Sequence, residues 1–547
     1  MDNKRVLLAF ILSFAVLIAF RWAFPPAVEQ PAPPATPPPA TATVPPADVK
    51  QPPAAPKAPS AGVPVPQDLH ADQAEGTVIE NSLYKATVYN EGGVLKSFQL
   101  IKAPYFDATG HPLELINGVS ANAVGWPLSI ATGDPKLDAF LAHAVFVVKR
   151  DGDKLSLEFA GDGIHVRKTM EFDPENYQFS VTTLLERDGQ AVPHQLVWQA
   201  GFGDQSVPDE PKKKNAVYDA DSKFTRVVLS GIKAPVDVTT SLIGAEDQYF
   251  ISMFVLPQPG PVKISETEFN AADSTPSKAL RLAVPGAQTV RIYVGPKDES
   301  RLLQADPRLG AILNYGFFGF ISKPVILPAL KWIHGYVGNY GWAIVLITIL
   351  VNLVLFPLRL KSQISMQKMQ KIQPQVNTLQ DKYKKMKAND PRRAEVQAEI
   401  MKLYQEHGSP IGGCLPLLLQ MPVMLSFYSM LSVSIELRQA PWILWVHDLS
   451  RPDPYYIIPI LMAIAMVIGQ KMTPTTVDPA QAKMMLIMPV VMTVFFLWVQ
   501  SGLTLYWLTS NLVGIGQQWF IRKYWGGDRD RDSKVKLVKA SQQGTSR

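Results

Sequence analysis

The chain has 547 residues, enough for more than one domain, and its formal net charge is +6 with a pI near 9.0. Its basic residues gather between Arg359 and Lys402 and after Arg522, which suits cytoplasmic loops of a membrane protein and argues against a nucleic-acid-binding face. The sequence has one cysteine, Cys414, so an intrachain disulfide is excluded, and we interpret Cys414 as a packing residue.

The first 24 residues predict a membrane anchor. Two basic residues precede an apolar run from Val6 to Phe20, a pattern that a cleaved signal peptide shares. No small-x-small cleavage site follows the run, whereas Arg21 and Trp22 are typical of a membrane interface. We therefore predict an uncleaved signal-anchor helix at residues 1–24, with its N-terminus in the cytoplasm.

Residues 25–75 are predicted to be a linker. Sixteen of the 42 residues from Pro25 to Pro66 are proline, and such a stretch favours extended polyproline II over a packed core. A ligand for a proline-recognition domain is the alternative interpretation.

Residues 76–300 predict an all-β domain. Short alternating runs at 84–89, 154–159 and 178–183 are separated by Gly, Asp, Asn and Pro, which is typical of an antiparallel β sandwich. His165 and His194 lack metal-ligand spacing, and the scattered carboxylates give little support to a glycosidase. We find no convincing enzyme signature in this domain.

Residues 301–339 predict an amphipathic segment lying in the membrane interface. Aromatic residues alternate there with lysines and prolines, and the uncharged stretch before Lys323 is too short to span about 30 Å of hydrocarbon.

Five further membrane spans follow. Residues 340–358, 412–435 and 455–470 carry no charge over 19, 24 and 16 residues. The uncharged stretch 484–521 has 38 residues, more than one bilayer needs, so we divide it into spans at 484–499 and 503–521. With the anchor, this makes six spans and places both termini on the same side.

The loop 359–411 predicts a cytoplasmic helical hairpin. It carries eleven Lys or Arg against four acids between Arg359 and Lys402, and the tail 526–547 is also basic. The positive-inside rule assigns both segments to the cytoplasm, which places the β domain on the opposite side. Apolar residues at helical spacing, including several methionines, either hold the hairpin together or form a groove for apolar segments.

Short motifs from about Leu313 to Ile521 resemble those of YidC-type membrane protein insertases (the YidC/Oxa/Alb family). In these motifs, polar residues stand within apolar segments at the positions that the family pattern gives them. The motifs lie at 412–422, 436–441, 445–449, 453–456, 470–476, 488–490, 501–507 and 510–512. The anchor, linker and large β domain match the layout of the Gram-negative form of the family.

The resemblance implies an α-helical inner-membrane protein with a five-helix insertase core at 340–525 and a periplasmic β supersandwich. It implies that the protein inserts and folds other membrane proteins, alone or with the Sec translocon, through a hydrophilic groove open to the cytoplasm and to lipid. No cofactor, metal or chemical reaction is expected. The expected partners are nascent membrane proteins, the Sec translocon, the ribosome, the signal recognition targeting machinery and the bilayer, with a monomer sufficient.

One position departs from the family pattern. Members typically carry a groove arginine where this sequence has Asn352, six residues before Leu358. Arg359 lies seven residues after Asn352, on nearly the same helical face but about 10 Å nearer the cytoplasm. Arg359 either replaces this charge in part or acts as a topology anchor.

Polar and aromatic residues of the spans are the candidate groove residues. Each unsatisfied polar group in hydrocarbon costs several kcal/mol, so a polar groove would ease the passage of a substrate tail. Hydrogen bonding between helices and aromatic packing are the alternative roles. The candidates are Thr348, Asn352, Gln420, Tyr506, Trp507, Ser510 and Asn511.

Two further expectations concern partners and energy. Four hairpin lysines, Lys382, Lys384, Lys385 and Lys387, are candidate contacts for the ribosome or targeting machinery because ribosomal RNA is a polyanion. No nucleotide-binding loop is present, so partitioning of the substrate helix into lipid and the membrane potential must drive insertion. The motifs all lie after Leu313, so we expect the β domain to be largely dispensable for insertion.

Two rival functions stay open at this level. A transporter or channel would need a two-sided path and usually has internal repeats, which the spans do not show. An anchored periplasmic protein that binds or modifies carbohydrate would depend on its β domain instead.

Overall fold

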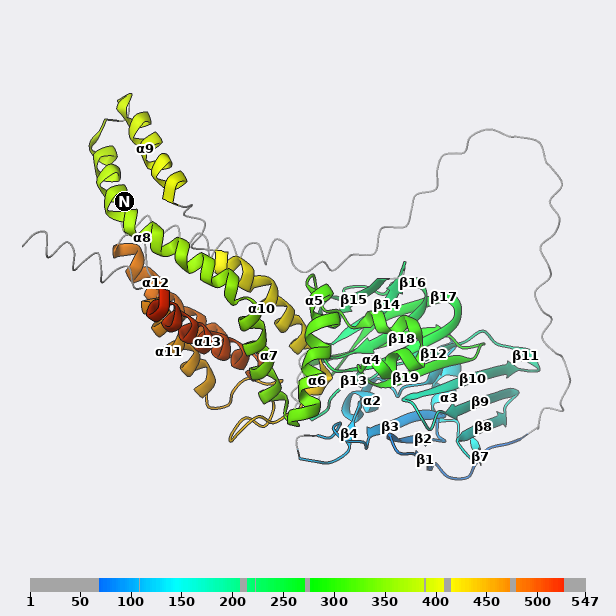
Figure 1. The fold of residues 1–547 in the computed structure, drawn as a ribbon. Coiled ribbons are helices and arrows are strands. Elements are labelled where there is room, and N and C mark those ends of the chain that lie inside the picture. Colours follow the sequence, from blue (N-terminus) through cyan, green and yellow to red (C-terminus); the bar gives the residue numbers. More distant parts are fainter. Residues whose placement is uncertain are drawn as a thin grey trace, which may run out of the picture. The chain divides into compact units, whose positions relative to one another are not determined.

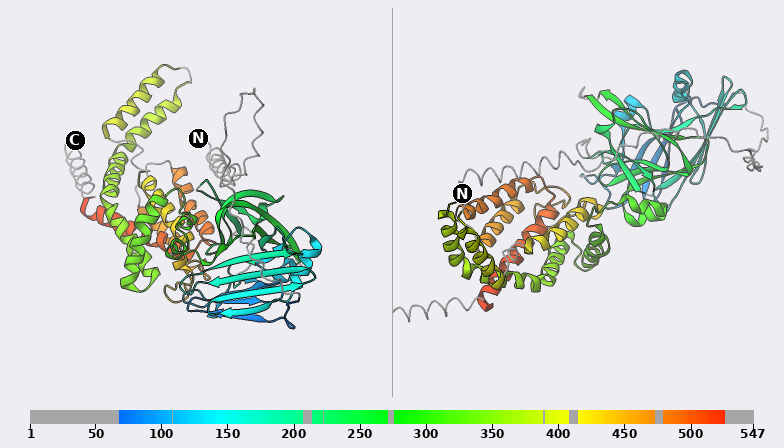
Figure 2. Two further views of the ribbon diagram at one scale, coloured as in Figure 1. Left: turned by 90° about the vertical axis from the view of Figure 1, so that its right-hand side faces the viewer. Right: turned by 90° about the horizontal axis from the view of Figure 1, so that it is seen from above.

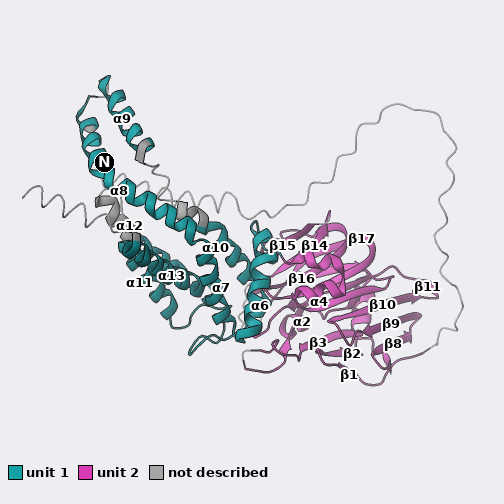
Figure 3. Cartoon of the chain, viewed as in Figure 1, with its two compact units in different colours: residues 1–14, 314–547 teal, residues 15–313 magenta. Residues whose placement is uncertain are grey.

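The computed structural model describes residues 68–107, 109–206, 214–221, 223–270, 276–387, 390–407, 415–472 and 479–525. The predicted anchor at 1–24, nearly all of the linker, Cys414 and the tail 526–547 lie outside these residues. The described residues fall into two compact units, one ending at Leu313 and the other beginning at Asn314. Figure 1 shows the chain coloured along its sequence, and Figure 3 shows the two units in different colours.

The unit before Asn314 is built of β-strands, as the alternating sequence predicts. Its strands are β1 (Gly76–Glu80), β2 (Tyr84–Tyr89), β3 (Val94–Leu100), β4 (Leu113–Glu114), β5 (Ile116–Asn117), β6 (Ser129–Ala131), β7 (Val147–Asp151), β8 (Lys154–Gly161), β9 (Ile164–Phe172), β10 (Gln178–Arg187), β11 (Gln190–Ala191), β12 (Gln195–Trp198), β13 (Gly201–Phe202), β14 (Asn215–Ala220), β15 (Lys223–Val228), β16 (Val236–Glu246), β17 (Phe250–Asn270), β18 (Pro276–Pro285) and β19 (Val290–Pro296).

These strands form two main antiparallel sheets, seen from two sides in Figure 2. The smaller has the order β1-β2-β3-β4, and the larger has 13 strands with the central path β15-β14-β16-β17-β19-β10-β9-β8-β7. Alternate side chains of β2 and β10 are buried, and rings from both sheets meet in the core, where Phe98 of β3 lies 6.3 Å from Phe179 of β10.

Asp-Gly turns fix the register of this unit. Asp162 and Gly163 both have positive φ between β8 and β9, as a two-residue type I′ hairpin requires. Short helices complete the unit: α2 (Gly118–Val124), α3 (Pro135–His143), η2 (Leu229–Gly231), α4 (Glu299–Ala305) and η3 (Pro307–Ile312).

Both histidines of interest have partners within the sheet. His165 lies between two carboxylates, 3.0 Å from Glu158 Oε1 and 3.2 Å from Glu186 Oε2, and His194 Nε2 lies 2.7 Å from Thr183 Oγ1. Among the described residues, no group of three or more His, Cys, Asp or Glu side chains could hold a metal ion.

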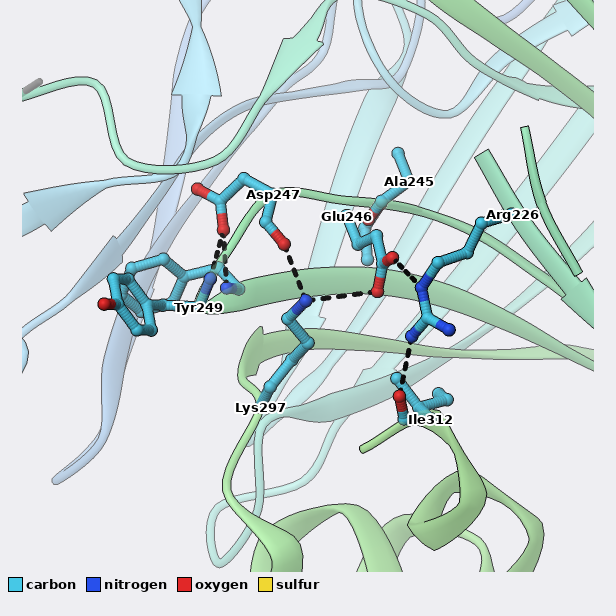
Figure 4. Close-up of polar contacts among 9 residues, drawn as sticks. Arg226, Ala245, Glu246, Asp247, Tyr249, Lys297 and Ile312 are labelled. Carbon is cyan, nitrogen blue, oxygen red and sulfur yellow. Dashed lines mark hydrogen bonds and ion pairs between the residues drawn. The ribbon is translucent and has the colours of Figure 1, made fainter. Parts of the chain in front are cut away.

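Buried charges fasten the end of the β unit to its sheet (Figure 4). Glu246 of β16 accepts from Arg226 Nε at 2.6 Å and from Lys297 Nζ at 3.1 Å. Arg226 also donates from Nη2 to the Ile312 carbonyl in η3 at 2.6 Å. The segment that leaves the β unit is therefore held by ion pairs between β15, β16 and the end of β19.

The second unit is helical. Its elements are α5 (Gly319–Ile321), the π-helix η4 (Ser322–Ile326), α6 (Leu327–Val337), α7 (Tyr340–Val354), α8 (Phe356–Lys385), α9 (Arg392–His407), α10 (Leu415–Val433), η6 (Ile435–Leu437), α11 (Ile457–Met472), α12 (Pro479–Phe496) and α13 (Ser501–Trp525). The predicted interfacial segment 301–339 is thus divided, because α4 and η3 belong to the β unit and α5 to α6 belong to the helical one.

Helix ends in this unit follow local signals. Gly338 ends α6 in the left-handed conformation, and Asn339 caps α7 by accepting from Trp342 N at 3.1 Å. Asp453 receives the Trp445 indole N–H at 3.0 Å and the Ile458 N–H at 2.8 Å, which stabilises the start of α11.

Helices occupy all five predicted core spans, but the structure does not by itself confirm six spans. Within the described residues, no single helix has the length and apolar character to cross a membrane. The bent pair of α7 and the first part of α8, with 56° between them, reaches that length, and Ile457–Met472 and Ile487–Phe496 are shorter apolar helices.

The hairpin is formed by α8 and α9. Met369, Ile372 and Val376 are buried against three residues of α9, which are Ile400, Leu403 and Tyr404. For Met369, the structure therefore favours a role in holding the hairpin together over a role in an open groove.

Candidate functional site

A cavity of about 420 Å³ lies among α8, α10, α11, α12 and α13. Six of the residues singled out from the sequence line it: Arg359, Gln420, Tyr506, Trp507, Ser510 and Asn511. The lining also includes Gln363, Met424, Met466, Gly469, Gln470, Met488, Pro489, Gly514, Ile515, Gln517, Gln518 and Ile521. Among these lining residues of the described chain, Arg359 carries the one formal charge.

The guanidinium of Arg359 lies between two glutamines from different helices. Its Nη2 donates to Gln420 Oε1 at 2.8 Å, and its Nη1 donates to Gln517 Oε1 at 3.1 Å. Gly514 lies close to the guanidinium, since a Cβ added at Gly514 would be 3.6 Å from Nη1 of Arg359. Amide oxygens orient the cation without neutralising it, so its positive charge persists in the cavity.

Gln420 extends this chain of hydrogen bonds to α13. Its Nε2 donates to the Tyr506 hydroxyl at 2.7 Å and lies 3.4 Å from Ser510 Oγ. Tyr506 is buried and stacks on Phe427 with centroids 4.3 Å apart. The Tyr506 side chain is therefore fixed by packing on its ring and by a polar contact at its hydroxyl.

Trp507 and Asn511 occupy the same wall of the cavity. The Trp507 ring meets Phe496 of α12 edge to face at 5.0 Å, and the Asn511 side chain donates to the Trp507 carbonyl at 2.9 Å. Both therefore have local packing or hydrogen-bonding partners in addition to their place on the cavity.

Thr348 and Asn352 lie behind the cavity and do not line it. Both are buried on α7, where Thr348 Oγ1 donates to Ile344 O at 2.6 Å and Asn352 Nδ2 donates to Thr348 O at 2.7 Å. Ser510 Oγ approaches Asn352 Oδ1 at 3.4 Å, so Asn352 touches the cavity wall through Ser510.

Sequence reasoning missed Gln363, Gln470, Gln517 and Gln518. The signal for Gln517 was present, because Ser510, Gly514 and Gln517 follow at spacings of four and three and so share one helix face. Ser510 was already a candidate residue. A search for further polar residues on its face of the same apolar segment would have identified Gln517.

The hairpin lysines lie outside this cavity. Lys382, Lys385 and Lys387 are exposed, and the Lys384 side chain lies outside the described part of the structure. Among the described side chains, Arg392 pairs with Asp390 at 2.8 Å.

A cavity lined by several polar side chains and one cation, with no carboxylate among its described lining residues, suits polar and anionic groups of a chain entering from outside. Its five glutamines each carry a donor and an acceptor, as a polypeptide backbone does.

Comparison with known proteins covers both units. The family described as 60Kd inner membrane protein matches residues 332–527, and the family described as YidC periplasmic domain matches residues 77–327. The membrane protein insertase YidC of Citrifermentans bemidjiense is 35% identical over 546 residues, covering 95% of this chain and 99% of the relative. The YidC insertase of Oleidesulfovibrio alaskensis is 33% identical over 562 residues, with the same coverage.

Solved structures are more distant. A crystal structure of an active YidC insertase with its first transmembrane domain resolved is 18% identical, with a TM-score of 0.35, and covers 83% of this chain and 94% of its own. The assignment rests on the sequence relatives, which match both the β unit and the helical unit over nearly their full length. On these matches, the chain belongs to the YidC family of membrane protein insertases.

Proposed function

We propose that the chain inserts membrane proteins into the bacterial inner membrane and that a polar segment of the substrate enters the cavity around Arg359. The observation that carries this proposal is a cavity that holds several polar side chains and one cation, inside helices with apolar outer faces. Exposed apolar residues on α7, α11 and α12 include Leu350, Val354, Ile460, Ile464, Val490 and Phe495. Such faces suit lipid, whereas the cavity shortens the apolar path for a polar tail.

Arg359 takes the role of the arginine that family members carry at the position of Asn352. Support comes from its place in the cavity lining and from its two neutral partners, Gln420 and Gln517. A cation that served only as a topology anchor would need no such enclosure. The charge attracts acidic substrate tails toward the cavity.

Asn352 and Thr348 support this site from behind, and the remaining candidates form its wall. Asn352 links the wall to α7 through Ser510. Gln420, Tyr506, Trp507, Ser510 and Asn511 offer the substrate hydrogen-bonding and aromatic surface.

The proposed topology has six spans, both termini in the cytoplasm and the β unit in the periplasm. The excess of Lys and Arg in the hairpin and tail supports this orientation. The exposed apolar side chains of Phe317, Phe320, Trp332 and Tyr336 support an interfacial location of α5 to α6.

The hairpin and tail are proposed to meet ribosomes or the targeting machinery, and the core to work alone or with the Sec translocon. The exposure of Lys382, Lys385 and Lys387 supports an electrostatic contact. Replacing the four lysines from Lys382 to Lys387 by glutamine should weaken ribosome binding and its dependence on salt, measured by co-sedimentation.

The test of the proposal is insertion of single-span substrates into liposomes that contain the purified full chain. Arg359→Gln should reduce insertion of a substrate with an acidic tail by about tenfold, the scale of a lost charge-assisted hydrogen bond. A neutral-tailed substrate should be affected little. Arg392→Gln, which removes an exposed arginine of the hairpin, serves as the matched control.

Two results would contradict the proposal. Unchanged insertion of the acidic-tailed substrate by Arg359→Gln would remove the cavity charge from the mechanism. Solute flux through the reconstituted protein, without substrate insertion, would favour a channel.

A further inference from the structure

We propose that Gln517 is a positioning residue that joins the bend between α7 and α8 to the cavity cation and thereby sets the preference for acidic tails. This inference rests on the proposed function, since the preference is exerted by Arg359 in the same cavity. We assign Gln517 no direct contact with the substrate protein.

The helices α7 and α8 follow each other along the chain with a sharp bend between them. α7 ends at Val354 and α8 begins at Phe356, and their axes differ by 56°. Pro357, in the first turn of α8, has no N–H to continue the hydrogen-bond ladder of α7. Just past the bend, Arg359 in the first turn of α8 contacts Gln420 of α10 and Gln517 of α13.

A helix end leaves main-chain carbonyls to be satisfied by other groups. At this end, Val351 O accepts from Leu355 N at 3.0 Å, and Asn352 O accepts from Gln517 Nε2 at 3.0 Å. Gln517 belongs to α13, 165 residues away in sequence, so α13 supplies the partner that a straight helix would have supplied itself.

The other half of the same carboxamide holds the cation. Gln517 Oε1 accepts from Arg359 Nη1 at 3.1 Å, just past the bend. The orientation of the amide is fixed, because only its oxygen can accept from a guanidinium and only its nitrogen can donate to a carbonyl. One side chain therefore connects the last turn of α7 with the first turn of α8 across their bend.

The Gln517 side chain is neutral, and this leaves the charge of Arg359 uncompensated. A carboxylate at position 517 would hold Arg359 as well or better but would cancel its charge, whereas an amide leaves the charge for a ligand. Arginine has five N–H donors, and the two bonds to Gln517 and Gln420 leave others for a substrate carboxylate.

The experiment measures the ratio of insertion between two single-span substrates that differ only in an aspartate-rich or asparagine-rich tail. Full-length protein in liposomes is compared for Gln517→Leu, Gln517→Glu, Arg359→Gln and the double variant Arg359→Gln/Gln517→Leu. Gln375→Leu, an exposed glutamine of α8, is the control.

Gln517→Leu and Gln517→Glu are each expected to lower the acidic-to-neutral ratio by about tenfold, with insertion of the neutral tail preserved. In the Arg359→Gln background, Gln517→Leu should lower the ratio no further, because Gln517 affects the ratio only by positioning Arg359. Equal loss of both substrates would show a merely structural role and overturn the inference.

The outcomes also separate this inference from the proposed function. A ratio lowered by Arg359→Gln but unchanged by both Gln517 variants would leave the cavity function intact and refute the positioning role. A ratio unchanged by Arg359→Gln itself would refute the role of the cavity charge and the inference together.

Discussion

Glu246 of the β unit and Arg359 of the helical unit have opposite electrostatic surroundings. In the β unit, Glu246 is almost fully buried, and burial raises its pKa, but Lys297 and Arg226 hold that pKa below its ordinary value. In the helical unit, the buried part of Arg359 meets two neutral amides beside a cavity. A compensated charge fastens structure, whereas a charge among neutral dipoles that also borders a cavity stays available for a ligand.

The largest loss of stability is expected when the carboxylate of Glu246, which compensates two cations of the β unit, is removed. Glu246→Leu leaves Lys297 and Arg226 without their carboxylate and should lower the free energy of unfolding by about 3–5 kcal/mol. Urea denaturation of the full chain, followed by hydrogen exchange of β16 and β17, measures it.

Lys278→Met is the control for this prediction, since Lys278 is an exposed residue whose ion pair with Glu266 is screened by solvent and should contribute little to stability. If Glu246→Leu is as mild as this control, the ion pairs of Figure 4 do not hold the end of the β unit.

Lys168 sharpens the comparison because this cation of the β unit, within the described structure, donates to neutral carbonyl oxygens. It is fully buried, and its Nζ donates to the Gly93 and Leu128 carbonyls at 2.7 Å each. Burial lowers the pKa of the Lys168 ammonium to about 7. Burial also lowers the pKa of the neighbouring His194, and the charge of Lys168 contributes to that shift.

The lowered pKa of Lys168 makes the stability of the β unit depend on pH. Lysine in the unfolded chain titrates near 10.4, so the unfolded state binds more protons than the folded state between about pH 7 and 10. Stability should therefore rise with pH, by about 2–3 kcal/mol from pH 7 to 9. Below pH 7 the penalty is fully present.

Hydrogen exchange of β9 and β10 in the full chain, compared between the native protein and Lys168→Met at each pH, isolates this contribution. A difference between the two proteins that does not change with pH would show that Lys168 keeps an ordinary pKa despite its burial.

The smallest effect is expected for Asn352, which lies behind the cavity. Asn352→Leu removes a hydrogen bond to Thr348 O and the approach of Ser510, and should cost about 0.6 kcal/mol of stability, typical of polar contacts between membrane helices. We expect a moderate loss of insertion, while Asn352→Arg should be accepted with a gain for acidic tails. Crosslinking to a nascent helix and liposome insertion measure both, and full activity of the leucine variant would exclude Asn352 from the working site.

Local patterns of the sequence determined much of this architecture. Alternation at residues 84–89, 154–159 and 178–183 predicted β2, β8 and β10, because side chains of a strand point to opposite faces whatever it packs against. Uncharged stretches located α10 to α13 for a similar reason, since hydrocarbon excludes charge along the whole segment. Motifs within them identified the family, which the relatives confirm.

The tertiary structure alone decided which polar residues meet. Helical periodicity placed Arg359 near the face of Asn352 but could not predict the 56° bend or the glutamines that receive its guanidinium from 61 and 158 residues away. Nor does any local pattern bring Arg226, Glu246 and Lys297 together or bury Lys168. Periodicity is a property of a few consecutive residues, whereas these contacts depend on how distant helices and strands pack, and packing alone determines which buried charges find an opposite charge.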